Sequence, residues 1–410
     1  MARVVFLLGA GASRPACMPC TQQITDRVLS GEGVECYHLR DCDTTPYHYH
    51  YTVSAKDEVP TQDQWRQCDW KDEIPPITEY LGYMYRLACD YYRNRSGDLC
   101  WARRDYSPNY EDLHYLVSQV RDERFAPNPL IRDTSAAIRC ETERLADKYR
   151  DLHLKTYLSL STLFYIEGVV TSLVSGRPDS TDYLDRLVGK ACRNLGPQNV
   201  DIATLNHDRV IDVFLRAQGF PYDDGFEREE AEGYRRFSPA VYRRSCRDGR
   251  ARVMKLHGGI EWARRWPSDD SRDAEIVMAV DGRVTDPVGP IGSHMYGLPI
   301  QIGTYNKILD YTLHRHLSDL QCQFLQSLDS SELVVGAGYS FGDPGINARV
   351  GHWASGPGKR RLVIVDPHPN HAKRELGSDW NDWERWEILS VVEKPIEDTT
   401  WDEVVALAGM

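Results

Sequence analysis

The sequence has little of what would place it on nucleic acid, in a membrane or outside the cell. Lys and Arg number 49 against 61 Asp and Glu, a net charge of -12, so no broad basic surface is available to neutralise a phosphate backbone. No run approaches the roughly 20 apolar residues that a membrane span needs, and the first apolar run lacks a signal peptide's basic segment and cleavage site. The 11 cysteines, an odd number scattered over 410 residues, indicate a reducing compartment. We expect a soluble, cytoplasmic protein that binds neither membrane nor nucleic acid directly.

Internal repeats and low-complexity linkers are also missing, so the pattern of apolar runs must indicate the fold. Five runs have the length and β-branched character of strands buried on both faces. They are residues 3–8, 200–205, 251–256, 333–335 and 361–365. After Lys307, apolar residues recur at three- and four-residue steps from Leu309 to Leu328, as on one face of a helix. The alternation predicts an α/β fold with a Rossmann-like, doubly wound parallel sheet.

A large insertion separates the first predicted strand from the second. Residues 31–71 are polar and aromatic without a clear period, which predicts a long loop or an irregular segment. Residues 77–92, 110–120 and 134–174 show helical periodicity. We expect residues 1–30 and 190–410 to form the Rossmann-like domain, and residues 31–189 to form a mostly helical insertion that acts as a lid.

Two of the predicted strands lead into segments that suit a ligand, because open α/β sheets bind ligands at the carboxyl ends of their strands. The first segment is Gly9-Ala10-Gly11-Ala12-Ser13. Its small residues allow a pyrophosphate to approach the backbone at a helix start, although a tight strand-to-helix turn is the alternative. The second contains Thr204, Asn206 and Asp208. Asp208 has the alternative of a helix N-cap, which does not account for Asn206.

The three other predicted strands also end in candidate residues. His257 follows an apolar strand and precedes two glycines, so its imidazole is a candidate for moving a proton at neutral pH; a structural histidine is the alternative. Gly338, Tyr339 and Ser340 form another turn that a ligand could approach. Asp366 ends the next strand, where many dinucleotide folds place a side chain that meets a ribose or base.

Taken in order, these four segments resemble the sirtuin superfamily. Sirtuins carry a Gly-Ala-Gly loop, a Thr-x-Asn-x-Asp segment, a strand-terminal His-Gly and a later Gly-Thr-Ser turn. The segments GYSFGDPGIN (338–347) and PNYEDLHYLV (108–117) look more similar to bacterial sirtuin-like proteins of antiviral defence than to protein deacylases. The resemblance covers residues 1–30 and 200–369, a little under half of the chain.

The resemblance implies that NAD lies across the switch point of the sheet, as a substrate. The Gly9–Ser13 loop and the Gly338–Ser340 turn would then hold the pyrophosphate and riboses, with Thr204 and Asp366 also in contact with NAD. Asn206 would position the attacking water or the nicotinamide ribose. Asp208 would contact the carboxamide, and His257 would act as the general base.

The sequence departs from a sirtuin deacylase in its zinc module. That module has two Cys-x-x-Cys pairs after the catalytic histidine, whereas here the pair of Cys17 and Cys20 comes long before it. The cysteine and histidine spacing near the N-terminus, which also includes Cys36, Cys42, His48 and His50, fits no compact zinc knuckle. We therefore expect no metal, and water in place of an acyl-lysine as the nucleophile.

The expected activity is that of an NAD glycohydrolase, which releases nicotinamide and ADP-ribose. The alternatives are an NAD-dependent deacylase, an ADP-ribosyltransferase, and a non-catalytic sensor of NAD or ADP-ribose derivatives. By the resemblance, the enzyme would be a toxic effector of antiphage defence that depletes NAD in abortive infection. We expect a homo-oligomer, with a HerA-type hexameric ATPase as a candidate partner.

Overall fold

Two compact units make up the protein. The computed structural model describes residues 3–39, 49–53, 65–67, 70–95, 107–121, 128–228, 234–245, 248–265, 275–279, 300–302 and 315–409. The sheet unit comprises Met1–Cys20, Ser175–Gln301 and Lys307–Met410, and the helical unit comprises Thr21–Val174 with Ile302–Asn306. Compared with the expected division at residues 30 and 190, α1 (Thr21–Ser30) groups with the helical unit and the segment from Ser175 groups with the sheet unit.

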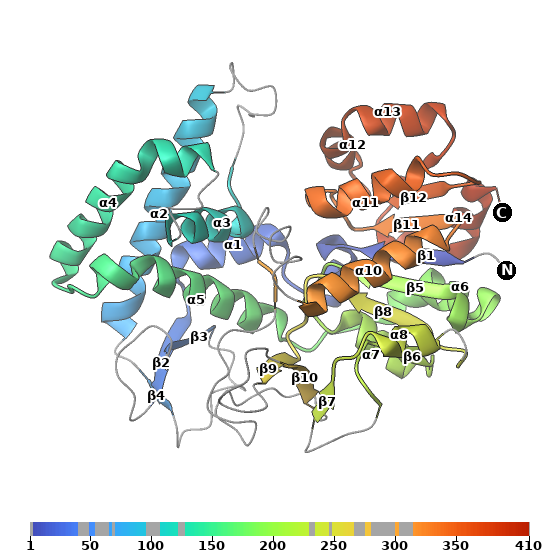
Figure 1. The fold of residues 1–410 in the computed structure, drawn as a ribbon, viewed down its shortest axis with the longest axis horizontal. Helices are drawn as coiled ribbons and strands as arrows, with labels where there is room; N and C mark the ends of the chain where they lie inside the picture. The colour runs from blue at the N-terminus through green and yellow to red at the C-terminus, as the bar shows by residue number, and fades with distance from the viewer. Residues whose placement is uncertain are drawn as a thin grey trace. The chain divides into compact units, whose positions relative to one another are not determined.

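A seven-stranded parallel sheet forms the centre of the sheet unit (Figure 1). Its strands lie in the order β13 (Leu389–Val392), β12 (Arg361–Val365), β11 (Leu333–Ala337), β1 (Val4–Leu8), β5 (Val200–Thr204), β8 (Ala251–Lys255) and β6 (Tyr222–Asp223). Every pairing is parallel. The five strands predicted from the sequence are the five central ones, so the α/β prediction is confirmed.

The strand order is that of a Rossmann-like fold. From β8 to β13 the sheet runs β8-β5-β1-β11-β12-β13, which is the order 3-2-1-4-5-6 of doubly wound dinucleotide-binding sheets, with β6 added at one edge. The chain builds outward from β1 through β5 and β8, then returns to β11 on the other side of β1. The order therefore reverses between β1 and β11, and this pair of strands is the switch point.

Helices cover both faces of the sheet. They are α6 (Val188–Leu195), α7 (Val210–Ala217), α8 (Ala240–Ser245), α10 (Arg315–Asp329), α11 (Pro344–Ala354), α12 (Asn370–Leu376), α13 (Ser378–Arg385) and α14 (Trp401–Ala408). Val5 and Leu7 of β1 belong to one apolar core together with α8, α10, α11 and α13. Phe6 points to the opposite face, where its ring centroid lies 6.1 Å from that of Trp401.

Short elements complete the sheet unit. Four are 3-10 helices, η1 (Ala10–Ala16), η4 (Asp182–Arg186), η5 (Pro197–Asn199) and η6 (Ile396–Asp398). Three form a small antiparallel sheet in the order β7 (Tyr234–Arg236), β10 (Glu275–Ala279) and β9 (Trp262–Arg265). The helical period predicted after Lys307 is confirmed for Leu317, Leu320, Phe324 and Leu328, all buried in α10, while Leu309 and Leu313 lie outside the described residues.

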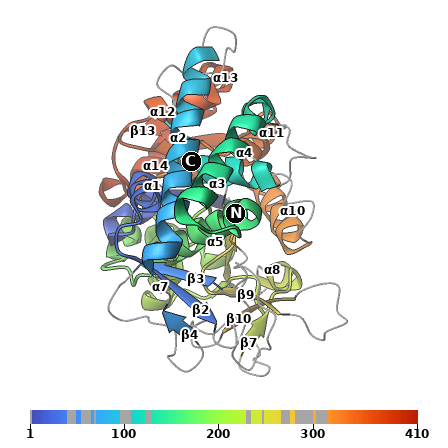
Figure 2. The same cartoon turned by 90° about the vertical axis from the view of Figure 1, so that its left-hand side faces the viewer.

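The helical unit contains the predicted helices and an antiparallel sheet that the sequence did not predict. Its main helices are α2 (Trp70–Arg95), α3 (Tyr110–Arg121), α4 (Pro129–Tyr149) and α5 (Leu154–Val174), which pack on one another (Figure 2). The segment expected to be irregular contains β2 (Val34–Leu39), β3 (Tyr49–Val53) and β4 (Trp65–Gln67), in the order β3-β2-β4. The sequence of this segment has no clear period of two, so a prediction from hydrophobic periodicity missed these strands.

One helix corrects the expectation that no segment resembles a membrane span. The 21-residue α5 is long and apolar enough to cross a membrane by length and composition. It is apolar around its whole circumference, as a helix enclosed by other elements is, and it packs against β3, α1, α2, α3 and α4. More than half of it is buried within the fold, so it serves as the central helix of the helical unit, consistent with a soluble protein.

Candidate functional site

The carboxyl ends of four neighbouring strands bring the predicted segments to one edge of the sheet. Leu8 of β1 pairs with Thr204 of β5 and with Ala337 of β11, and Thr204 pairs in turn with Lys255 of β8. The segments that follow these strands therefore leave the sheet side by side. Because the switch point lies between β1 and β11, this edge is where Rossmann-like sheets bind ligands.

The two glycine segments pack directly against each other. Gly11 N donates to Gly338 O over 2.9 Å. A Cβ at Gly9 would lie 2.6 Å from Gly338 O, and a Cβ at Gly338 would lie 2.1 Å from the backbone N of Ala12. Gly338 also has φ +59°, which glycine adopts without steric cost. The close contact between the two loops is by itself enough to explain why glycine occupies positions 9 and 338. Ala10 and Gly11, by contrast, are exposed.

The helix expected after the first glycine loop differs from an ordinary α-helix. It is the seven-residue 3-10 helix η1, with Pro15 inside it and Cys17 at φ 62° as its C-cap. Proline has no N–H to donate, and the left-handed Cys17 ends the helix. The helix start predicted here is therefore that of a short 3-10 helix, and a ligand there would depend on the loop's own N–H groups and on Ser13.

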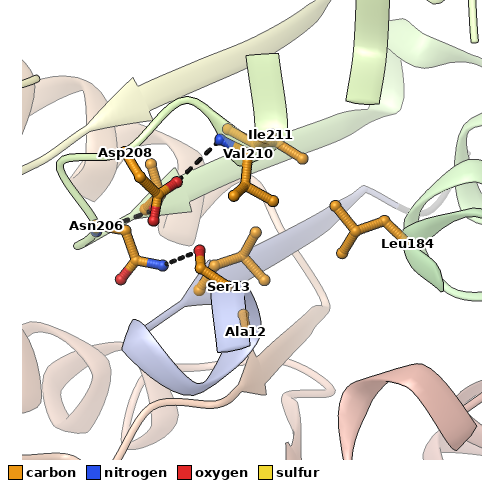
Figure 3. Close-up of a pocket in the computed structure, with 9 residues that line it drawn as sticks. Ala12, Ser13, Leu184, Asn206, Asp208, Val210 and Ile211 are labelled. Carbon is orange, nitrogen blue, oxygen red and sulfur yellow. Dashed lines mark hydrogen bonds between the residues drawn. The ribbon is translucent and has the colours of Figure 1, made fainter. Parts of the chain in front are cut away.

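Asn206 connects the loop after β5 to the loop after β1. Its Nδ2 donates to Gly9 O over 2.9 Å and to Ser13 Oγ over 2.8 Å. Its backbone N donates to Thr204 Oγ1 over 3.1 Å. These bonds fix the orientation of the amide, and Figure 3 shows its oxygen on the side away from Ser13.

Asp208 is buried. Its side chain faces the pocket and also accepts a hydrogen bond from the backbone. Its Oδ1 accepts a hydrogen bond from Val210 N, the first residue of α7, over 2.9 Å. The N-cap itself is Arg209, so the N-cap alternative for Asp208 is wrong by one position. Burial raises the pKa of Asp208, against the lowering effects of the Val210 and Ser13 hydrogen bonds and the Lys255 charge. Ser13 Oγ accepts from Asn206 Nδ2 and favours the ionised form of Asp208.

These residues line one small pocket in the sheet unit (Figure 3). Its walls are Leu8, Ala12, Ser13, Leu184, Thr204, Asn206, Asp208, Val210 and Ile211, around about 230 Å³ of empty space that includes open solvent. An amide, a carboxyl group and two hydroxyls thus face apolar side chains from β1, η4 and α7. Leu184 comes from a segment that the sequence division assigned to the insertion. The space within it that admits a water-sized molecule is about 10 Å³, room for about one water, so a larger group binds at the mouth of the pocket or after these side chains move apart.

His257 lies near this pocket but is not one of its nine lining residues among those described. It follows β8, is 3% exposed, and its ring centroid lies 6.4 Å from that of His207, the neighbour of Asn206. Its Nε2 is 2.9 Å from Oδ2 of Asp343. Asp343 is 6% exposed and was missed by the sequence argument, although Asp-Pro-Gly is a typical helix start.

The remaining predicted residues lie on neighbouring loops. The Tyr339 hydroxyl donates to Asn347 Oδ1 over 2.8 Å, so its ring supports its own loop. Ser340 is exposed, and Asp366 is half-buried with Oδ1 accepting from His368 N over 2.7 Å. Gly338 N donates to Val365 O over 3.2 Å, which keeps the Asp366 turn next to the glycine turn.

A buried ionic group underlies the site. Lys255 Nζ lies 2.8 Å from Asp212 Oδ2 and 3.9 Å from Glu261 Oε2, and it donates to Asp208 O over 2.9 Å. Burial disfavours the lysine charge, but Asp212 and Glu261 outweigh it and raise the pKa of Lys255. Burial also raises the pKa of Glu261. This group holds the backbone of the loop that carries Asp208.

Neither a family model nor a curated protein matches the chain. Among the described residues, no group of three or more His, Cys, Asp or Glu side chains is arranged to hold a metal ion; Cys42 and His48 lie outside them.

Proposed function

We propose that the sheet unit binds NAD and hydrolyses its nicotinamide–ribose bond. The observation that carries this proposal is the gathering of Ser13, Asn206 and Asp208 in one pocket, beside the contact between the Gly9 and Gly338 loops. In a Rossmann-like sheet this is the edge that binds dinucleotides. The resemblance to sirtuin-like proteins, stated on the same residues, supports NAD as the ligand.

In this proposal, nicotinamide and its ribose bind at the mouth of the pocket, whose side chains move apart to admit the ring. The apolar side chains Leu184, Val210 and Ile211 suit the flat face of an aromatic ring, and Asp208 meets the carboxamide. An ionised Asp208 accepts from the amide, and a protonated one donates to the amide oxygen. The pyrophosphate lies over the exposed backbone of Ala10 and Gly11.

The reaction is a glycoside hydrolysis with an oxocarbenium-like transition state. The bond between C1′ of the ribose and the nicotinamide nitrogen breaks, and nicotinamide leaves with the electron pair. A water oxygen bonds to C1′, and its proton passes to His257. Asn206, held through its Nδ2 by Gly9 and Ser13, orients the water or the ribose with its oxygen, which supplies the positioning part of the rate enhancement.

Incubation of the purified protein with NAD tests this function. The proposal predicts nicotinamide and ADP-ribose in equal amounts without any peptide, and loss of turnover by about 100-fold or more in His257→Ala. Release of nicotinamide only with an acetylated peptide would instead indicate a deacylase, and transfer of ADP-ribose to protein would indicate a transferase. Tight NAD binding without any cleavage would indicate a sensor.

The proposal also includes a biological role for the reaction. An enzyme that removes NAD harms its own cell, so it suits an effector of abortive infection that acts in the cytoplasm when phage are detected. A homo-oligomer or a HerA-type hexameric ATPase would supply the gate. The test is the NAD content of infected cells that express the wild-type chain or the Asn206→Ala variant.

A further inference from the structure

Asp343 makes two connections with one carboxylate. Its Oδ1 accepts from Gly345 N over 2.8 Å and Ile346 N over 3.0 Å, so it is the N-cap of α11. Its Oδ2 lies 2.9 Å from Nε2 of His257. The chain separates these two residues by 86 positions, and they meet because β8 and β11 end at the same edge of the sheet.

The surroundings of Asp343 favour its ionised form. Two backbone N–H groups point at one oxygen, and the positive end of the 11-residue helix α11 lies beside it. An ionised carboxylate accepts hydrogen bonds and donates none. The hydrogen between Oδ2 and Nε2 therefore belongs to His257.

We infer that Asp343 is a positioning residue that holds His257 in the tautomer with the proton on Nε2, which makes Nδ1 the nitrogen that receives the proton from water. This role rests on the proposed NAD hydrolysis. During the reaction Nδ1 takes the water proton as the water oxygen bonds to C1′, and His257 becomes positively charged. The Asp343 carboxylate stabilises that charge without taking the proton, and solvent later removes it from Nδ1.

The burial of both side chains strengthens this pairing. Exposed ion pairs contribute little, because water competes for both partners, whereas His257 and Asp343 are 3% and 6% exposed. The carboxylate is also fixed by its bonds to α11, and the backbone N of Asp343 donates to the Tyr339 hydroxyl over 3.3 Å. A fixed partner aligns the imidazole before the substrate arrives, which is the arrangement that favours proton transfer.

Asp343→Asn is the informative variant. Asparagine is as good an N-cap as aspartate, so its oxygen can still bind Gly345 N and Ile346 N. Its NH₂ group then faces Nε2 and favours the opposite tautomer of His257. In a serine protease, the equivalent Asp-to-Asn change lowers kcat by about 10⁴-fold through the wrong tautomer, so we expect a fall in kcat of at least about 100-fold with little change in KM.

Thr400→Ala is the matched control. Thr400 caps α14 of the same unit, with Oγ1 accepting from Glu403 N and Glu403 Oε2 accepting from Thr400 N. Thr400→Ala removes a helix cap, which is the same kind of stabilising contact that Asp343 makes at α11. It leaves His257 and its surroundings unchanged. We expect a lower melting temperature and unchanged kcat for this control, and an unchanged melting temperature for Asp343→Asn.

Nitrogen-15 NMR of histidine-labelled protein reads the tautomer directly, with His257→Gln to assign the signal. The inference predicts the Nε2–H form in the wild type and the Nδ1–H form in Asp343→Asn. A wild-type Nδ1–H signal, or full kcat in Asp343→Asn, would overturn it. If the wild-type protein leaves NAD intact, the proposed function fails, while the NMR result still decides whether Asp343 sets the tautomer.

Discussion

The side-chain nitrogen of Asn206 lies 2.9 Å from Gly9 O and 2.8 Å from Ser13 Oγ, so one amide connects the loops that follow β1 and β5. We expect Asn206→Ala to abolish measurable NAD cleavage, because it removes the group that orients the reacting water or ribose. Ser13→Ala removes one bond to that amide and should lower kcat by about 10-fold, the worth of about one neutral hydrogen bond.

Steady-state kinetics of the two variants provide the measurement. Ser327→Ala is the control, because Ser327 is fully buried and donates to Gln323 O over 2.9 Å within α10, away from the site. Equal losses of kcat in Ser13→Ala and Ser327→Ala would show that the Ser13 effect is not specific to the pocket.

Gly338 should be the least replaceable glycine of the site. A Cβ there would lie 2.1 Å from Ala12 N in addition to the left-handed φ of +59°, so Gly338→Ala should lower the free energy of unfolding by about 3 kcal/mol. Gly219→Ala has a similar φ of +69° with nothing within 4 Å of the new Cβ, and should cost only about 1–2 kcal/mol. Urea unfolding measures both; equal losses would refute the close contact of the two loops.

The ionised Asp208 carboxylate should lower the stability of the folded protein at neutral pH, although NAD cleavage requires this side chain. Because burial raises its pKa, the folded protein binds the proton more tightly than the unfolded chain does, so wild-type stability from this group falls as pH rises through the aspartate range. Asp208→Asn, which keeps an acceptor for Val210 N, should melt at a higher temperature than the wild type at pH 7 and at the same temperature below pH about 3.5, while losing NAD cleavage. A lower melting temperature at pH 7 would contradict the raised pKa.

Lys255 should be essential for folding stability. Its replacement by methionine leaves Asp212 buried without the cation that it pairs with, and Glu261 with only Arg209 at 3.6 Å, which should cost about 3–5 kcal/mol. Lys190→Met is the control, because Lys190 pairs with Asp402 over 2.5 Å at an exposed site, where ion pairs contribute less than about 1 kcal/mol. Thermal unfolding of both variants checks the difference, and similar small losses would show that the buried group is dispensable.

The centre of the fold was predictable and its periphery was not. Strands buried on both faces are continuous apolar runs, so β1, β5, β8, β11 and β12 were visible in the sequence. The two-residue β6 and the four-residue β13 lie at the edges, where short segments give little pattern. The 3-10 form of η1 depends on Pro15 and on the left-handed Cys17, and the latter conformation is unusual for a non-glycine residue.

The candidate site was predictable at the level of loops but not of contacts. Residues at strand ends could be grouped because parallel strands end at one edge of a sheet, which brought Ser13 and Asn206 into the same prediction. The partner of His257 could not be found this way, because Asp343 also has the local role of a helix cap. Leu184 was missed for a different reason, since its 3-10 helix lies outside the predicted domain boundary.

Release of nicotinamide from NAD by the purified chain is the most direct test of the account. At enzyme and substrate in equal concentration, the wild-type protein should release nicotinamide and ADP-ribose in a 1:1 ratio without peptide, and Asn206→Ala and His257→Ala should release neither while keeping the wild-type fold by circular dichroism. Intact NAD with the wild-type protein, or equal cleavage by either variant, would contradict it.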